Sequence, residues 1–133
     1  MREAVLTVDV VLDEIIEVNG SYAKAAMILF HGESNCDAFK GRILPGAVDT
    51  QKEPLGEKRL LSARYVLEGT DSTGEKCRIF IENNGVIEDP AGEIRTTPLV
   101  YTDSKSLKWL ETAELYGTVQ GKSGGVFISI YKK

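Results

Sequence analysis

Histidine and cysteine are scarce in this chain. It has one histidine, His31, and two cysteines, Cys36 and Cys77, among 133 residues. A Ser-His-Asp or Cys-His site would have to use that single histidine, and the cysteines show neither CxxC nor Cys/His spacing. His31, Glu33 and Cys36 are close in sequence but lack the further ligands of a structural zinc site. We therefore expect no metal ion, and the two cysteines fit a reduced, cytoplasmic protein better than a disulfide framework.

Long apolar runs and basic clusters are also missing. No segment approaches the roughly 20 apolar residues of a membrane span, and Asp9, Asp13 and Glu14 interrupt the N-terminal stretch, which therefore does not read as a secretory signal. The net charge is −4, from 16 basic and 20 acidic side chains, so neither nucleic acid nor a membrane is an expected partner. No glycine-rich phosphate loop is present, and no cofactor is expected.

What the chain does contain is a period-two alternation of apolar and polar residues, which indicates β-strands. Turn residues separate the runs, and Asn19-Gly20 is the strongest hairpin signal among them. Residues 50–58 are polar and are predicted to form a loop, while Pro98 suggests an edge, a bulge or a strand start. The predicted strands span residues 3–12, 15–18, 22–32, 39–44, 60–68, 76–83, 93–101, 112–120 and 125–132.

One segment departs from this period. Asp103 and the residues after it can cap a short helix, with Leu107 and Leu110 on one side, near residues 103–110. Strands at this spacing favour a barrel or a sandwich, and closure into a barrel removes exposed strand edges. We therefore predict an all-β fold in which residues 1–133 form a single antiparallel β-barrel domain of about eight to nine strands with that short helix.

Two central strands each have one apolar face and one mixed face. Tyr65 lies on the apolar face of residues 60–68 and Arg64 on the mixed face; Glu82 and Asn84 lie on the mixed face of the next strand. In one interpretation the mixed faces meet solvent, and Arg64 and Glu82 form a weak cross-strand pair. In the other they line a barrel lumen, where a few polar groups orient a ligand.

Two further residues are candidates for a site. Asp49 follows a Pro-Gly turn, where an aspartate commonly makes an Asx-type turn; it becomes a general base or an Arg64 partner only if the loop folds over a pocket. Trp109 is expected to be a core or lid aromatic, because no basic or aromatic stripe accompanies it.

An ordered set of residues resembles an uncharacterised family, domain of unknown function 3237, also called uncharacterised protein family 0311. These residues are GRILPGAVD at 41–49, Ala63-Arg64-Tyr65, Asp71 with Gly74, Ile79, Asn83-Asn84-Gly85, Thr97-Pro98 and Trp109-Leu110. The resemblance implies a compact antiparallel β-barrel without an established reaction, and it implies that Asp49, Arg64 and Asn84 match recurring motif positions. The family usually has a second glycine where this chain has Ala47, so no glycine-only geometry is expected there.

Three functions are compatible with the sequence. The first is a barrel that binds a small organic molecule, with Arg64 addressing a carboxylate or enolate-like oxygen, Glu82, Asn84 and Asp49 near it, and Tyr65 or Trp109 as apolar wall. The second is a cofactor-independent isomerase, cyclase or lyase in which Asp49 or Glu82 removes a proton and Arg64 stabilises the developing charge. The third is a structural or protein-interaction module, and a homo-oligomer is also compatible with the sequence.

Overall fold

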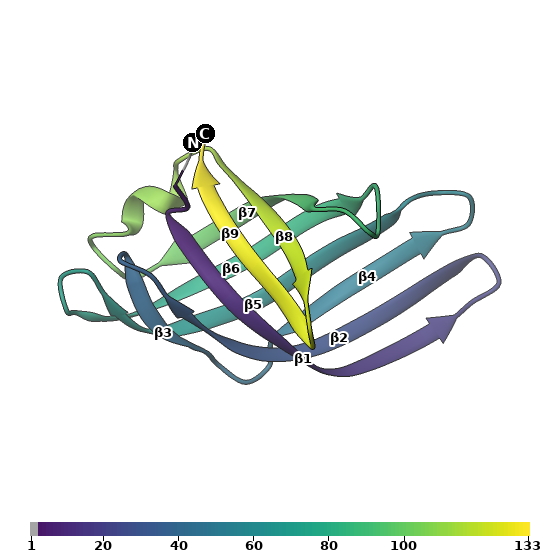
Figure 1. Cartoon of the computed structure of the whole chain (residues 1–133), viewed down its shortest axis with the longest axis horizontal. Helices are drawn as coiled ribbons and strands as arrows, with labels where there is room; N and C mark the ends of the chain where they lie inside the picture. Colours follow the sequence, from purple (N-terminus) through teal and green to yellow (C-terminus); the bar gives the residue numbers. More distant parts are fainter. Residues whose placement is uncertain (1–2) are drawn as a thin grey trace.

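The described part of the protein, residues 3–133 of a computed structural model, consists almost entirely of β-strands (Figure 1). One short 3-10 helix, η1, lies between the seventh and eighth strands. The elements in chain order are β1 Leu6–Asn19, β2 Ala23–Asn35, β3 Phe39–Ile43, β4 Val48–Pro54, β5 Arg59–Asp71, β6 Lys76–Ile87, β7 Ile94–Thr102, η1 Lys108–Glu111, β8 Leu115–Lys122 and β9 Gly125–Lys132.

The strands close into an antiparallel barrel. The order β1-β9-β8-β7-β6-β5-β3-β2-β4 is completed by β1–β2 and β5–β4 pairings. The short strands β3 and β4 share the place between β2 and β5: β3 pairs with Glu33–Asn35 of β2, and β4 pairs with residues 23–29. The predicted all-β antiparallel barrel is confirmed, and its eight strand positions are filled by nine strands.

The structure corrects three local predictions. Residues 50–58 are not simply a loop, because residues Val48–Pro54 form the strand β4. The polar sequence of β4 gives no sign of a strand, but its backbone pairs with β2 on one side and with β5 on the other. The runs 3–12 and 15–18 belong to one strand, β1, which contains a bulge between Leu12 and Glu14. The helix near residues 103–110 is reduced to the single 3-10 turn of η1.

Pro98 lies at a local strand edge, one of the three positions that the sequence suggested for it. It is in β7, opposite Asn83 of β6, but β7 pairs with β8 only at Ile94, Arg95 and Thr96. A residue without an N–H is therefore placed where the pairing on the β8 side has ended. In the Pro45-Gly46 turn, Gly46 has φ +104°. Among residues 3–133 positive φ occurs only at glycines, so Ala47 has an ordinary backbone as expected.

One end of the barrel is closed by packed side chains. Leu107 and Leu110, from η1 and the segment before it, are buried against the core. Beneath them the Asp71 carboxylate accepts hydrogen bonds from Thr73 N (2.9 Å), Thr73 Oγ1 (2.6 Å), Glu75 N (3.2 Å) and Ser104 Oγ (2.7 Å). These bonds hold the β5–β6 turn to the segment that covers this closed end.

The opposite end is bordered by longer strands. In Figure 1 the β1–β2 hairpin extends beyond the β8–β9 turn toward the right of the picture. Beyond Val11, β1 no longer pairs with β9 and retains only β2 as a neighbour. We call this the open end of the barrel. No helix within residues 3–133 is long and apolar enough to cross a membrane.

Candidate functional site

A cavity of about 140 Å³ lies inside the barrel toward its open end. Leu12, which is 37% exposed, forms part of its rim, while Phe30 and Ile128 are buried in its wall. The wall is mainly apolar and is interrupted by three polar side chains. The complete lining is Val10, Leu12, Ile28, Phe30, Asp49, Gln51, Leu61, Ala63, Asn83, Ile94, Val119, Val126 and Ile128.

Asp49 reaches this cavity because β4 is a strand. Its register, opposite Ile28 of β2 and Ala63 of β5, places it on the inner face. The Oδ2 atom accepts a hydrogen bond from Gln51 Nε2 at 2.8 Å, whereas the buried Oδ1 atom has no hydrogen-bond partner within residues 3–133. Burial raises the pKa of the Asp49 carboxyl. The Gln51 hydrogen bond, a hydrogen bond from the Ser62 backbone and the Arg59 charge oppose that shift without cancelling it.

Asn83 and Thr96 supply further buried oxygens on the same inner face. Asn83 is 1% exposed, and neither its Oδ1 nor Thr96 Oγ1 has a partner in the described chain. A Cβ added to Gly117 would lie 2.4 Å from Thr96 Oγ1 and 3.5 Å from Asn83 Oδ1, so Gly117 leaves room for these two oxygens beside each other. Ala63 pairs with both Asp49 and Asn83, and its small side chain separates the two polar groups on the inner wall.

A polar chain leads from Asp49 toward the open end. Arg59 Nε donates to Gln51 Oε1 at 2.6 Å, and Arg59 Nη1 lies 3.6 Å from Glu53 Oε1. Sequence reasoning missed Arg59 and Gln51. The sequence did place Arg59 on the same face of its strand as Leu61, Ala63 and Tyr65. That face points to Gln51 only because residues 48–54 form the neighbouring strand, which the sequence did not reveal.

The mixed faces of β5 and β6 do not line the lumen: of the two interpretations left open by the sequence, the one in which they meet solvent holds, and the lumen interpretation is wrong. Arg64 Nε pairs with Glu82 Oε1 at 3.0 Å on the outside of the barrel, with side chains 59% and 27% exposed. Asn84 Nδ2 donates to Glu82 Oε2 at 3.0 Å, and Ser62 Oγ donates to Asn84 Oδ1 at 2.7 Å. The pKa of Glu82 is lowered, first by Asn84 and then by Arg64. The apolar faces point inward because they bury more hydrophobic area there.

The two aromatic candidates lie away from the cavity. Tyr65 is buried, packs edge-to-face on Phe30 with ring centroids 5.5 Å apart, and burial raises the pKa of its hydroxyl, which has no partner among the described residues. Trp109 lies in η1 at the closed end, with Lys132 Nζ 5.7 Å from its ring centroid. Of the candidates named from sequence, only Asp49 therefore lines the cavity, and Tyr65 supports its wall through Phe30.

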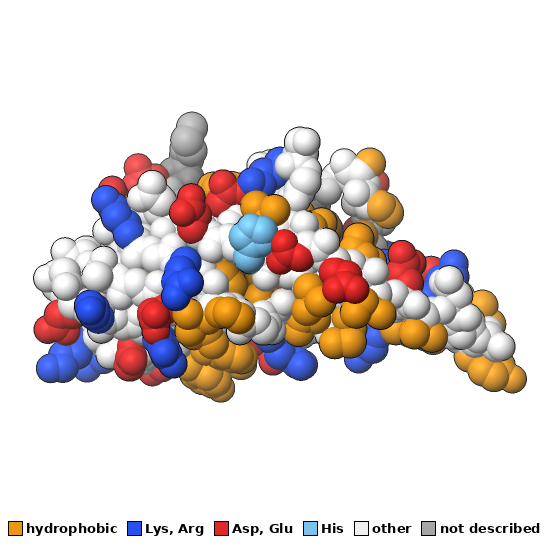
Figure 2. Space-filling model, turned by 90° about the horizontal axis from the view of Figure 1, so that it is seen from below, with side chains coloured by type: hydrophobic (Ala, Val, Ile, Leu, Met, Phe, Trp, Pro, Cys, Tyr) orange, Lys and Arg blue, Asp and Glu red, His pale blue; other side chains and the backbone are white. Residues whose placement is uncertain are grey.

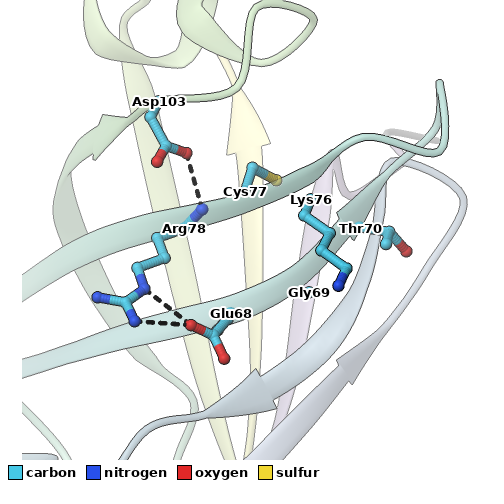
Figure 3. A pocket seen from close by; sticks show the side chains of 7 residues that line it. All are labelled: Glu68, Gly69, Thr70, Lys76, Cys77, Arg78 and Asp103. Atoms are coloured by element: carbon cyan, nitrogen blue, oxygen red, sulfur yellow. Dashed lines mark hydrogen bonds and ion pairs between the residues drawn. The ribbon is translucent and has the colours of Figure 1, made fainter.

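A larger groove of about 490 Å³ lies on the outer surface at the closed end (Figure 3). Figure 3 shows Arg78 and Glu68 pointing toward each other, and their Nη2 and Oε2 atoms are 2.8 Å apart. Asp103 accepts a hydrogen bond from the Arg78 backbone at 2.8 Å, and burial raises the pKa of the Cys77 thiol. The carboxylates of the groove are already paired, and the raised pKa keeps the Cys77 thiol unreactive. The groove is therefore a weaker candidate for a functional site than the inner cavity.

His31 forms a local pair rather than a metal site. Its Nδ1 lies 2.7 Å from Asp13 Oδ1, and Asp13 is the extra residue of the β1 bulge. Among residues 3–133 no three His, Cys, Asp or Glu side chains are grouped so that they could hold a metal ion. Both cysteines are free thiols.

Comparison with known proteins assigns the chain to a family. The model of a family described as "Protein of unknown function (DUF3237)" matches residues 2–133. The chain belongs to the DUF3237 family. A relative, the UPF0311 protein CA_C3321 of Clostridium acetobutylicum, is 32% identical in an alignment over 98 residues that covers 62% of this chain. The match spans 60% of that relative's length.

Three solved structures share the fold of this DUF3237 chain. A Clostridium acetobutylicum protein with unknown function has a TM-score of 0.81 at 24% identity and covers 99% of this chain and 98% of its own. A conserved protein of unknown function from Rhodopseudomonas palustris has a TM-score of 0.75 at 18% identity, over 99% and 96%. A β-barrel-like protein from Acinetobacter baumannii has a TM-score of 0.76 at 19% identity, over 99% and 94%.

Proposed function

We propose that the barrel binds a small, largely apolar molecule that carries a hydroxyl or amino hydrogen-bond donor. One observation carries this proposal: Asp49 Oδ1 and Asn83 Oδ1 are buried without partners in residues 3–133, and both residues line the apolar cavity. A buried polar group without a partner costs about 1–3 kcal/mol. A ligand that donates to these oxygens recovers that cost.

The size and wall of the cavity narrow the ligand class. A cavity of about 140 Å³ is close to the ~150 Å³ apolar cavity that accommodates benzene in another protein. The molecule is therefore the size of a single ring or a short branched chain. Its apolar body contacts residues such as Phe30, Ile128 and Val126, while its donor meets the oxygens of Asp49 and Asn83.

A carboxylate ligand is not favoured at this wall. Arg64, which was expected to address such a group, lies outside the barrel, and the inner wall presents the Asp49 carboxylate instead. An anion beside Asp49 meets like charge in a desolvated setting, whereas a hydroxyl or an ammonium group meets an acceptor. Phenol and benzylamine are therefore suitable probes. Toluene, which has no hydrogen-bond donor, tests whether the donor matters, and benzoate tests whether a negative charge on the ligand prevents binding.

The test is titration of isotope-labelled protein with these probes, followed by amide NMR. Phenol or benzylamine is expected to shift the amide signals of Ala63, Asn83 and Ile81 saturably, and toluene to bind about tenfold or more weakly, because it forms no hydrogen bond to a charged acceptor. Benzoate is expected not to shift them. Ala63→Leu fills space between Asp49 and Asn83 and is expected to abolish the shifts.

Arg64→Gln is the matched control, because it changes an outer charge without touching the cavity. It should leave phenol binding within about twofold of the wild-type value. The proposal fails if neither donor-bearing probe produces saturable shifts inside the barrel. It also fails if Ala63→Leu binds them as the wild type does.

A second candidate function is proton transfer catalysed by Asp49. A desolvated carboxyl with a raised pKa beside a ligand-sized cavity is typical of a general base. In this case Asp49 takes a proton from one position of the bound molecule and returns it at another, which is an isomerisation. Asp49→Asn should abolish such turnover and Glu82→Gln should not, because Glu82 lies on the outside with a lowered pKa. Equal loss in both variants would exclude this role.

We also propose the cytoplasm as the compartment. The free thiols of Cys36 and Cys77 support it, because a reducing environment keeps thiols in that form. Thiol labelling of protein trapped directly from cells should modify Cys36, the more exposed of the two.

A further inference from the structure

The cavity inside the barrel has two polar side chains on one wall, with an alanine between them. Asp49, Ala63 and Asn83 occupy one row of the sheet. The Cα atoms of Asp49 and Asn83 are therefore two strand spacings apart, which is about 10 Å. Each of these two side chains has a buried Oδ1 atom without a partner in residues 3–133. A single donor reaches one of these oxygens at a time, so a ligand satisfies both together only if it carries two separated polar groups.

The charges around Asp49 favour a cation at that position. By register, the inner faces of β1, β2, β4 and β5 at the open end carry three acidic and two basic side chains, a net charge of −1: Glu17, Lys24, Asp49, Glu53 and Arg59. The basic Arg59 already donates to Gln51 Oε1 and lies 3.6 Å from Glu53. An ammonium group beside Asp49 therefore forms a charge-assisted hydrogen bond with a carboxylate that no other cation contacts directly.

The surroundings of Asn83 favour a neutral group instead. Asn83 is 1% exposed, and of the described residues that line the cavity Asp49 alone is charged. An ammonium group beside Asn83 would be buried without a counter-charge, which is costly. A hydroxyl group is neutral and both donates and accepts, so it suits an amide, which presents an oxygen acceptor and an N–H donor.

On the side of β1 and β2 the approach to the cavity is apolar. Ile15 and Leu12 are 54% and 37% exposed, and Ile15 pairs with Ile28 of the cavity lining. In Figure 2 hydrophobic side chains follow the lower edge of the molecule to its right-hand end, where Figure 1 has the hairpin tip. The body of a ligand therefore has apolar contacts on this side, while the polar groups of the lining belong to β4 and β6.

The separation of the two polar side chains also limits the ligand. Hydrogen bonds of about 3 Å at each end leave about 4 Å or more of the separation of about 10 Å, depending on their tilt, between the two polar groups of the ligand. Groups on neighbouring ring atoms are too close together for this. We propose that the ligand is a small ring amine with a hydroxyl group at its far end, the ammonium bound to Asp49, the hydroxyl to Asn83 and the ring over Ala63. This inference rests on the proposed function, because it concerns the same cavity.

The amide NMR titration used for phenol and benzylamine tests the inference with three further amines. Para-hydroxybenzylamine is expected to bind about tenfold more tightly than para-methylbenzylamine, which has a similar shape but leaves Asn83 without a partner. Ortho-hydroxybenzylamine carries its hydroxyl beside the aminomethyl group and is expected to bind within about threefold of benzylamine.

Two neighbouring asparagines provide the matched variants. Asn83→Leu replaces the inner amide by an apolar group of similar size, and it should abolish the preference for the para-hydroxy over the para-methyl amine while benzylamine still binds. Asn84→Leu makes the same change on the outer face of the same strand and should keep the preference of about tenfold. Circular dichroism of both variants confirms that the barrel is folded.

The outcomes separate this inference from the proposed function. If benzylamine binds saturably but the wild type binds the para-hydroxy and para-methyl amines equally, the inference is wrong and the proposed function stands. A preference that survives in Asn83→Leu, or an ortho-hydroxy amine that binds as tightly as the para isomer, also overturns the inference. If phenol and all of the amines fail to produce saturable shifts, the proposed function fails and this inference fails with it.

Discussion

The barrel holds an aspartate on its inner face near each end, and the two have opposite surroundings. At the closed end both carboxylate oxygens of Asp71 accept hydrogen bonds, chiefly from Thr73 and Ser104, and these bonds hold its pKa well below the usual range. Toward the open end Asp49 has one buried oxygen without a partner in residues 3–133, and burial raises its pKa. The same residue type on the same face is thus fully hydrogen-bonded at one end, while at the other it keeps an oxygen without a partner among residues 3–133.

The largest expected difference between the two ends concerns packing. Leu110→Ala at the closed end removes a buried side chain and should lower the free energy of unfolding by about 2–5 kcal/mol. Leu12→Ala at the open rim should cost less than about 1 kcal/mol, since that side chain is partly exposed already. Urea unfolding measures both. Equal costs would mean that the two ends are packed alike.

Removing the charge of Asp71 should lower the stability of the protein, whereas removing the charge of Asp49 should raise it. Asp71→Asn exchanges the acceptor of several charge-assisted bonds for an amide and should lower the melting temperature by several degrees near neutral pH. Asp49→Asn relieves the cost of a desolvated charge and should raise it. Thermal melts at one neutral pH suffice, and a fall in both variants would contradict the assignment of Asp49.

The pH dependence separates the two carboxylates further. Folding raises the pKa of Asp49, so its charge costs stability above that pKa, and the cost disappears as the pH falls to the unfolded value of 3.8. Folding lowers the pKa of Asp71, so its contribution is complete above 3.8 and is lost as the pH falls below that value. Melting curves of the wild type and both Asn variants, taken on acidification, should therefore show the Asp49 difference vanish first.

The smallest effect is expected outside the barrel, where a third carboxylate is paired with an arginine. Glu68 and Arg78 have side chains 39% and 63% exposed, and such surface pairs contribute below about 1 kcal/mol. A double-mutant cycle with Glu68→Gln and Arg78→Gln measures their coupling, which should shrink further in concentrated salt. A coupling well above that limit would show that outer charges matter as much as the inner ones.

Sequence reasoning reached the architecture by way of alternation. A strand was predicted over residues 3–12, and its alternate residues Leu6, Val8 and Val10 are all buried. Asn19-Gly20 was predicted to turn the chain, and it does so between β1 and β2. These features depend on a few neighbouring residues, so a local pattern reports them.

The candidate site was predicted only in part. Asp49 was named, but as a residue of a turn or loop, because the polar sequence of β4 conceals a strand that exists through its pairing with β2 and β5. Gln51 and Arg59 were missed for the same reason. Arg64 and Glu82 were correctly paired by register, yet the lumen interpretation put them on the wrong side of the wall.

By itself, then, the sequence determined the strands with strong alternation, the hairpin turns and which residues share a face, because period and turn chemistry are local properties. Only the tertiary structure decided which polar residues lie inside. Closure of the barrel buries the face of each strand that contributes more apolar area. Pairing between distant strands brings Asp49 and Asn83 to one wall, although 33 residues separate them in the chain. The place of Asp49 is thus a consequence of pairing between distant strands, which no local pattern contains.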